Sequence, residues 1–180
     1  MKKKSLPLSE VYRLLEPGPV VLLATRGKDG KPNVMTMSWH TMMEFEPPLI
    51  GCVVSGNDYS FKALTETKEC VIAVPEAKMI KTVVAIGNVS GKTTDKFKKF
   101  KLETTPAEKV SAPLIGGACI ANLECRVKDA SWKNKYNFFV LEVVKAWTNT
   151  AIKNPRMVHH RGKGLFVIDG KMVSIPSKAM

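Results

Sequence analysis

Short apolar runs of strand character dominate this chain and most constrain its fold. The run from Cys119 to Val127 alternates apolar and mostly polar residues, which is the period-two pattern of a half-buried strand. Further strands are expected at 20–25, 31–39, 49–55, 70–74, 138–144, 164–168 and 172–175. Few connections between these runs are long enough for a crossover between parallel strands. The sequence therefore predicts a mainly β fold with a few short helices, built as a mostly antiparallel barrel.

Turn and helix signals lie between the strands. Gly27-Lys28-Asp29-Gly30 contains an Asp-Gly pair, a strong hairpin signal between the first two strands. Helices are expected over 8–15, from 60 to about 65, from 75 to about 86 and over 95–100. Pro75 is placed in the first turn of the third of these. A barrel of this size has little interior space, so any cofactor should bind at its rim or at a subunit interface.

The composition is that of one folded domain, expected to span residues 1–180. The hydrophobic content of 44% over 180 residues is sufficient for a full core. No apolar run reaches the roughly 18 residues of a membrane span. The Lys2-Lys3-Lys4 start leads into an amphipathic stretch rather than a signal peptide. We therefore expect a cytoplasmic protein without a membrane partner.

The residues that commonly bind metals or act as nucleophiles form no recognisable site. Four irregularly spaced cysteines include no C-x-x-C pair and are predicted to be buried free thiols: Cys52, Cys70, Cys119 and Cys125. His159 and His160 are adjacent, so on a strand they point to opposite faces, and His40 completes no triad with them. The sequence predicts no metal and no catalytic side chain.

The chain is strongly basic, with 28 Lys+Arg against 16 Asp+Glu and a net charge of +12. The electrostatic field of such a positive charge attracts nucleic acid, acidic proteins or phosphorylated small molecules. A solvated face of lysines over 92–101 would account for the charge excess equally well. No sheet alternates exposed aromatics with arginine, which disfavours nucleic acid.

The segment from Gly87 to Thr93 is similar to a phosphate-binding P-loop, but it has one residue too few between its glycines. Ile86 stands where the first glycine should be, and the preceding segment is predicted to be helical. We interpret it as a basic surface loop that touches a phosphate or a dinucleotide, rather than as the site of an NTPase.

One set of residues suits an amphipathic phosphorylated ligand such as flavin mononucleotide (FMN). Its polar and aromatic members lie on one predicted strand, its apolar members follow Pro47-Pro48, and its hydroxyls open a helix. These candidate residues are Asn33, Thr36, Ser38, Trp39, Val53, Val54, Tyr59 and Ser60. An apolar strand can flank a ring system, and a helix N-terminus can bind a phosphate. Judged alone, Trp39 also fits a core aromatic and Ser60 an ordinary N-cap.

These segments, in this order, resemble the flavin reductase-like family with the FMN-binding split β-barrel, and within it the flavoredoxin-like branch. The resemblance covers nearly the whole chain. It rests on segments 33–39, 47–49, 59–60, 90–97 and 162–166. It implies a homodimer with one non-covalent FMN at each of two sites near the interface.

The resemblance also implies individual roles. Asn33, Ser38 and Trp39 would line the flavin, and Ser60 would bind its phosphate. Lys92 would approach the cofactor, and Phe166, otherwise a core strand residue, would pack near the ring. Tyr136 stands near a position where many members of the family carry a histidine. This departure from the family pattern argues against direct reduction of the flavin by a nicotinamide nucleotide.

Three functions follow as alternatives. The favoured one is an FMN-dependent oxidoreductase that passes electrons from NADH or NADPH to a flavin, a metal or a protein. The second is an FMN-bearing electron carrier that docks an acidic redox protein, and the third is a β-barrel that binds anions or nucleic acid. In the first, no side chain need act as a general base, because the flavin performs the redox chemistry.

Overall fold

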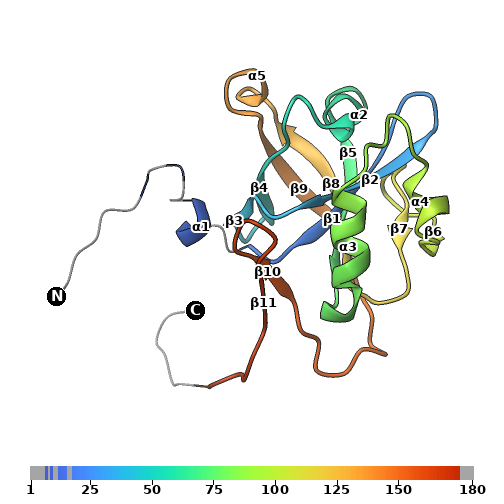
Figure 1. Ribbon diagram of the computed structural model, residues 1–180. Helices are drawn as coiled ribbons and strands as arrows, with labels where there is room; N and C mark the ends of the chain where they lie inside the picture. Colours follow the sequence, from blue (N-terminus) through green and yellow to red (C-terminus); the bar gives the residue numbers. More distant parts are fainter. Residues whose placement is uncertain (1–6, 8, 10–11, 16–17, 175–180) are drawn as a thin grey trace.

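The computed structural model describes residues 7, 9, 12–15 and 18–174 (Figure 1). Seven strands form one antiparallel sheet in the order β2-β1-β5-β8-β9-β4-β3. Their bounds are β1 Val21–Arg26, β2 Pro32–Met37, β3 His40–Glu44, β4 Leu49–Val53, β5 Glu69–Pro75, β8 Cys119–Asp129 and β9 Phe138–Thr148. Two small sheets pair β6 (Thr104–Thr105) with β7 (Leu114–Ile115), and β10 (Val158–His160) with β11 (Phe166–Ile168).

The helices are short and lie around this sheet. They are α1 Tyr12–Leu15, α2 Tyr59–Thr67, α3 Ile80–Gly87, α4 Lys96–Lys99 and α5 Lys133–Tyr136, with a 3₁₀ turn at Ala77–Met79 before α3. In Figure 1, α2 and α5 lie at the same end of the molecule, and α3 crosses in front of β1. The predicted fold class, mainly β and antiparallel with short helices, is confirmed. No helix in the described part of the chain has the length and apolarity to cross a membrane.

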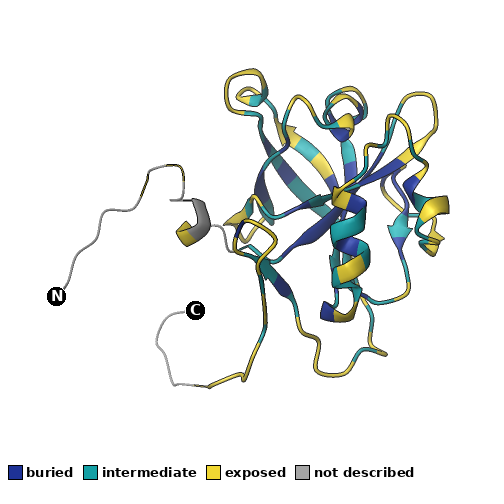
Figure 2. Cartoon of the chain, in the orientation of Figure 1, coloured by how far each residue is buried: buried dark blue, intermediate teal, exposed yellow. Residues whose placement is uncertain are grey.

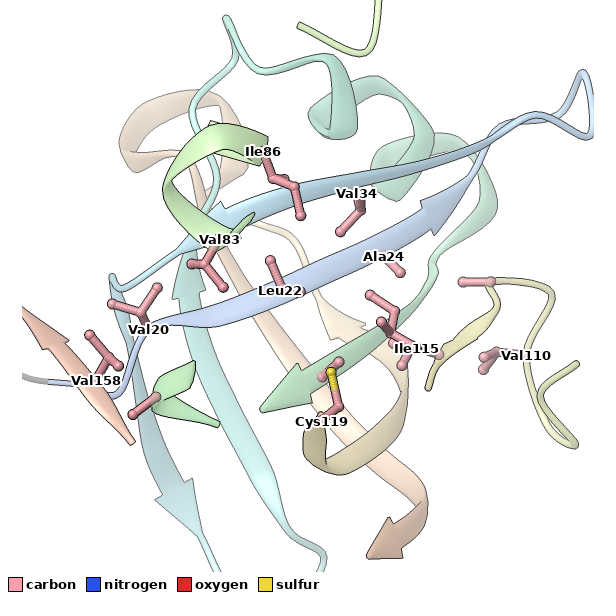
Figure 3. Packing of buried hydrophobic residues seen from close by; sticks show 14 residues of the cluster. Val20, Leu22, Ala24, Val34, Val83, Ile86, Val110, Ile115, Cys119 and Val158 are labelled. Carbon is pink, nitrogen blue, oxygen red and sulfur yellow. The ribbon is translucent and has the colours of Figure 1, made fainter. Parts of the chain in front are cut away.

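Strand β1 buries both of its faces, and this divides the core into two clusters. Leu22 packs with Val83 and Ile86 of α3 on one side of the sheet (Figure 3). Leu23, on the opposite face, packs with Leu64 of α2 and with Phe139 of β9. Successive strand residues point to opposite faces, so an unbroken apolar strand requires a cover on each side. Figure 2 shows the resulting buried stretch along the central strands.

Several predicted boundaries were wrong. Pro75 ends β5 instead of opening a helix, and the side chain of Glu76 accepts a hydrogen bond from the Lys78 N–H to start the 3₁₀ turn. Residues 172–174 form no strand, and Ile175 lies outside the described residues. Of the helix expected over 8–15, only Tyr12–Leu15 is observed, and residues 8, 10 and 11 lie outside the described part.

Strand β3 gave no sequence signal because it is an edge strand whose side chains are mostly exposed. Its residues His40–Glu44 show no alternation, and four of the five are exposed. It pairs only with β4 in the described sheet, where His40 lies opposite Cys52. The chain turns directly from β2 into β3, which places residues 38–41 at the rim of the barrel.

Candidate functional site

A polar pocket of about 300 Å³ lies between β2, the start of α2 and the loop that follows α3. We call it the polar pocket, and it is lined by Asn33, Met35, Thr36, Asn57, Asp58, Tyr59, Ser60, Gly87, Asn88, Val89, Ser90, Gly91 and Lys96. Each of the three elements is held by a specific contact. Thr36 Oγ1 of β2, for example, donates a hydrogen bond of 2.6 Å to the carbonyl of Val83 in α3.

Asn33 and Ser60 form the base of the polar pocket. The side-chain amide of Asn33 donates to Ser60 Oγ at 2.8 Å, and the two residues are only 4% and 1% exposed. Ser60 is the second residue of α2, and Asp58 occupies the N-cap position with extended backbone. The interpretation of Ser60 as an ordinary N-cap is therefore wrong. Its hydroxyl is held by a neighbouring strand beside the backbone N–H groups of the helix start.

Lys96 is a buried cation that lines the polar pocket, and the sequence analysis missed it. Its side chain is 5% exposed, and Nζ donates to the carbonyl of Ile86 at 3.0 Å. Burial lowers the pKa of Lys96 below its ordinary value of 10.5, while the negative charge of Asp58 acts in the opposite direction. The carboxylate of Asp58 itself accepts a hydrogen bond from the Ser55 N–H. Lys96 therefore places a positive charge in the pocket wall, and the Asp58 carboxylate is a nearby charge of opposite sign.

Gly91 allows the loop after α3 to lie directly against β2 and α2. A Cβ atom at this position would overlap Asn33 Oδ1 and lie 2.7 Å from Tyr59 Cδ1. The close approach brings the P-loop-like segment into the pocket wall, although Gly87 ends α3 and no strand precedes it. Ser90 organises the turn, because its carbonyl accepts from the N–H groups of Thr93 and Thr94.

A second pocket, of about 320 Å³, has a mostly apolar lining, and we call it the apolar pocket. It is lined by Leu15, Gly18, Ser38, Trp39, His40, Thr41, Gly51, Cys52, Val53 and Phe138. The Val53 N–H donates to the carbonyl of Trp39 at 3.0 Å, which joins the two walls. Trp39 is 52% exposed, so the interpretation of it as a core aromatic is wrong. The apolar pocket lies at the turn from β2 into β3 and along β4, whereas the polar pocket lies on β2 and at the start of α2, and the two share no lining residue.

The structure brings most of the candidate residues to these two pockets. Asn33, Thr36, Tyr59 and Ser60 line the polar pocket, and Ser38, Trp39 and Val53 line the apolar one. Three candidates lie elsewhere. Val54 is fully buried in the core, Lys92 is exposed in the loop, and Phe166 packs its ring 5.0 Å from that of His160. Lys96, four residues after Lys92, occupies the place in the pocket expected for a lysine.

The other reactive side chains take structural positions. All four cysteines are buried free thiols, as predicted. Burial raises the pKa of Cys52, which borders the apolar pocket, to about 12, so it remains a thiol rather than a nucleophilic thiolate. His40 Nε2 donates to the carbonyl of Pro19 at 2.7 Å. Across the described residues, no group of three His, Cys, Asp or Glu side chains is placed to hold a metal ion.

Comparisons with known proteins agree with this arrangement. An uncharacterized protein of Archaeoglobus fulgidus is 35% identical over 69% of this chain and 70% of its own length. The flavoredoxin of Desulfovibrio vulgaris (Miyazaki F) superposes with a TM-score of 0.85, at 22% identity, over 99% of both chains. An FMN-binding domain of a flavin reductases-like enzyme from Shewanella baltica gives a TM-score of 0.81, at 25% identity, over 96% of this chain and 97% of that one.

A family model described as "Flavin reductase like domain" matches residues 13–164, a range that includes every lining residue of both pockets. The match extends over most of the chain, from α1 to the turn before β11. The chain therefore belongs to the flavin reductase-like family.

Proposed function

We propose that the chain binds FMN, with the isoalloxazine ring in the apolar pocket and the phosphate in the polar pocket, and that it works as an oxidoreductase. The observation that carries this proposal is Lys96, a buried ammonium group in the wall of a polar pocket. Removing such a charge from water is costly unless a partner of opposite charge is provided. Asp58 offsets part of this cost, and a phosphate in the polar pocket would be a second partner of that kind.

The residues present fit both ends of this cofactor. Ser60 and Lys96 offer a hydroxyl and a cation to the phosphate, and the start of α2 adds backbone N–H groups and the positive end of the helix dipole. Trp39, Val53 and Phe138 supply apolar surface for a ring system, with the Ser38 hydroxyl among them. The names of the flavoredoxin and of the FMN-binding domain that share this fold also favour FMN.

When bound, FMN supplies both hydride and single-electron chemistry, and the protein positions it and tunes it. Asn33 orients the Ser60 hydroxyl toward the polar pocket through their hydrogen bond. Trp39 is half-exposed, so the apolar pocket remains accessible from solvent on that side. Our proposal requires no general acid or base from the chain.

The replacement Lys96→Met tests the phosphate site. We expect FMN affinity to fall by about ten- to a hundredfold, because a charge-assisted hydrogen bond contributes about 1.5–3 kcal/mol. Riboflavin lacks the phosphate, so its affinity should stay the same. The free energy of unfolding should change little, since methionine removes a desolvated charge at similar volume but also takes the donor away from the Ile86 carbonyl. Fluorescence titration with each flavin and a thermal melt provide the measurements.

Lys98→Met is the matched control, because Lys98 is an exposed lysine two residues away on α4. It should leave the affinity for both flavins unchanged. An equal loss for FMN and riboflavin in Lys96→Met, or no loss at all, would contradict the placement of the phosphate.

The electron donor is proposed to be NADH or NADPH, with an acidic redox protein as the second candidate. The second candidate is supported by the exposed lysines that surround Lys96 in sequence: Lys92, Lys98, Lys99 and Lys101. Exposed charges of one sign steer acidic partners and raise the association rate.

Stopped-flow reduction with NADH, NADPH and a reduced ferredoxin, each at two salt concentrations, separates these donors. Fast reduction by a nucleotide supports the enzyme, and reduction by the ferredoxin alone supports the carrier. If only the ferredoxin reduces the flavin, the double variant Lys98→Glu with Lys99→Glu should slow the association of the ferredoxin with the chain and weaken the salt dependence of that rate. An unchanged rate with every donor would mean that these lysines are only a solvated face.

A homodimer is also part of the proposal. Large apolar side chains are exposed on β3 and near it, and we call this surface the β3 face: Leu14, Leu15, Trp39, Met42, Met43 and Phe45. Exposed large apolar side chains on an edge strand are typical of a protein interface. Trp39 and Leu15 also line the apolar pocket, so a second copy on this face would cover the proposed ring site.

A further inference from the structure

The loop that joins β8 to β9 exposes two aromatic rings and two lysines at its tip. Trp132 and Tyr136 are 60% and 53% exposed, and their ring centroids lie 5.8 Å apart in an edge-to-face arrangement. Lys135 Nζ lies 5.0 Å from the centre of the Tyr136 ring. We call this surface, together with Lys133, the α5 tip. Large aromatic side chains that are exposed next to each other are typical of a surface that a partner covers.

The α5 tip is held in position at both of its ends. The carboxylate of Asp129 accepts hydrogen bonds from the N–H and the hydroxyl of Ser131, at 2.7 and 3.1 Å. At the other end, Asn137 accepts from the N–H of Val54 through its carbonyl (2.9 Å) and from the N–H of Gly56 through its side chain (3.1 Å). The two exposed rings therefore belong to an anchored loop, which reduces the entropy lost when a partner binds.

Phe138 connects the α5 tip to the apolar pocket. Its ring centroid lies 6.3 Å from that of Trp132. Phe138 lines the apolar pocket, and together with Trp132 it also lines a smaller pocket of about 150 Å³. Aromatic rings thus extend from the exposed tip to the site proposed for the isoalloxazine. Electron transfer slows steeply with distance, so a redox partner on the tip would be well placed to exchange electrons with that ring.

The charges of the α5 tip suit an acidic partner. Lys128, beside the tip, pairs with Glu142 at 2.9 Å. Within the described part of the chain, Lys133 and Lys135 form no ion pair with a carboxylate. Complementary charge directs a partner to a surface, and buried Trp and Tyr side chains contribute much of the affinity once it has docked. The tip offers both features.

We infer that the α5 tip is the docking surface for an acidic protein that carries single electrons and exchanges them with the flavin in the apolar pocket. The inference rests on the proposed function, because the flavin ring must lie in that pocket. Each reduced partner gives up one electron and leaves oxidised, and two such transfers, with two protons from water, reduce the flavin by two electrons. The lysines on and around α4, which lies on a different side of the molecule in Figure 1, attract the same partner from a distance without forming the contact.

Isothermal titration calorimetry of the full chain with an oxidised ferredoxin, an acidic iron–sulfur protein, tests the docking. We expect the double variant Lys135→Glu with Tyr136→Ala to raise Kd about tenfold or more, as is usual for truncation of a central aromatic side chain. Raised salt should weaken wild-type binding. Neither residue lines the apolar or the polar pocket, so FMN affinity should change less than about twofold.

Stopped-flow reduction tests the electron transfer itself. In the same double variant, reduction of the bound flavin by the reduced ferredoxin should slow about tenfold at subsaturating ferredoxin, in proportion to the loss of affinity. Reduction by dithionite, which is small and needs no docking surface, should keep its rate.

Lys153→Glu with Met172→Ala is the matched control. It makes the same charge reversal at an exposed lysine of the loop 149–157 and truncates an apolar side chain that is 90% exposed. Because the long-range field changes equally in both double variants, a difference between them reports the contact at the tip. The control should leave the Kd for ferredoxin within about twofold of wild type.

The outcomes separate this inference from the proposed function. A chain that takes up no FMN contradicts the proposed function, whereas the calorimetry still decides the docking surface. Absence of wild-type binding, or an equal loss of affinity in the double variant and the control, overturns the inference alone. Dissociation of a wild-type dimer in the double variant, measured by sedimentation velocity, would assign the tip to a second copy of the chain and also overturn it. Selective loss of ferredoxin binding, with FMN affinity retained, supports the docking surface.

Discussion

At the scale of single residues, the polar pocket depends on one glycine. The backbone of Gly91 does not require glycine, since its φ lies outside the left-handed region, but the space beside it does. A methyl group there would overlap Asn33 Oδ1, and Asn33 cannot move without losing its hydrogen bond to Ser60.

We therefore expect Gly91→Ala to weaken FMN binding by about five- to tenfold, the equivalent of one hydrogen bond of about 1 kcal/mol. Flavin fluorescence titration provides the measurement. Gly170→Ala is the control, because a Cβ at that position meets no atom within 4 Å. If the two variants bound FMN equally well, Gly91 would not shape the site.

At the scale of elements, two polar side chains of β8, one of them fully buried, hold the segment 104–115 against the sheet. Glu124 is fully buried, and its carboxylate accepts from the N–H groups of Glu108 (3.1 Å) and Lys109 (2.5 Å) and from Trp147 Nε1 (2.7 Å). Asn122 exchanges two hydrogen bonds with the backbone of Ile115, at 2.8 and 2.9 Å. The solvent-facing side expected for β8 is therefore covered by a loop.

Glu124 also makes stability depend on pH. Burial acts to raise its pKa, but the hydrogen bonds from Trp147, Lys109 and Glu108 outweigh burial and lower the pKa below its ordinary value of 4.5. A carboxyl with a lowered folded pKa stabilises the fold fully above its unfolded pKa. This stabilisation is lost as the pH falls through the folded pKa.

We expect Glu124→Gln to lower the free energy of unfolding at pH 7 by about 1.5–3 kcal/mol, because the hydrogen bonds lose their charged acceptor. The difference from wild type should shrink as the pH falls below 4.5. Urea unfolding at several pH values measures both effects. A difference that stayed constant with pH would show that the Glu124 charge is not what holds the loop.

At the scale of the whole molecule, the β3 face is the surface on which the proposed dimer depends. The sheet ends at β3, whose outer edge has no partner strand in the described part of the chain. Two core clusters share one sheet, and this sharing supports the proposal of a single domain over 1–180.

For the pair Met42→Glu and Phe45→Glu, we expect the dimer to dissociate at micromolar concentration, since two charges per subunit would be buried without partners. FMN affinity should fall as well, because the apolar pocket opens onto the same face. Sedimentation velocity and flavin titration give the two readouts. Met172→Glu, at an exposed apolar residue outside the β3 face and outside both pockets, is the control. A wild-type monomer that binds FMN fully would contradict both the assembly and the shared site.

The local sequence determined six of the seven strands of the main sheet, the hairpin and much of the candidate site. Alternation, the Asp-Gly turn and the Pro47-Pro48 entry act over a few neighbouring residues, so their effect can be read without knowing the fold. The polar candidates from Asn33 to Ser38 could also be identified from the local sequence, because they lie one after another along β2 and the turn that follows it at the rim of the barrel.

Tertiary structure alone decided which lysine enters the polar pocket. Lys92, Lys96, Lys98, Lys99 and Lys101 are equivalent by charge and by neighbourhood in the sequence. Lys96 is buried because the turn of α4 brings it to the carbonyl of Ile86, at the end of α3. Burial depends on which distant segments pack together, and the sequence near a residue does not record it. The exposed β3 and the buried Glu124 differ from expectation for the same reason.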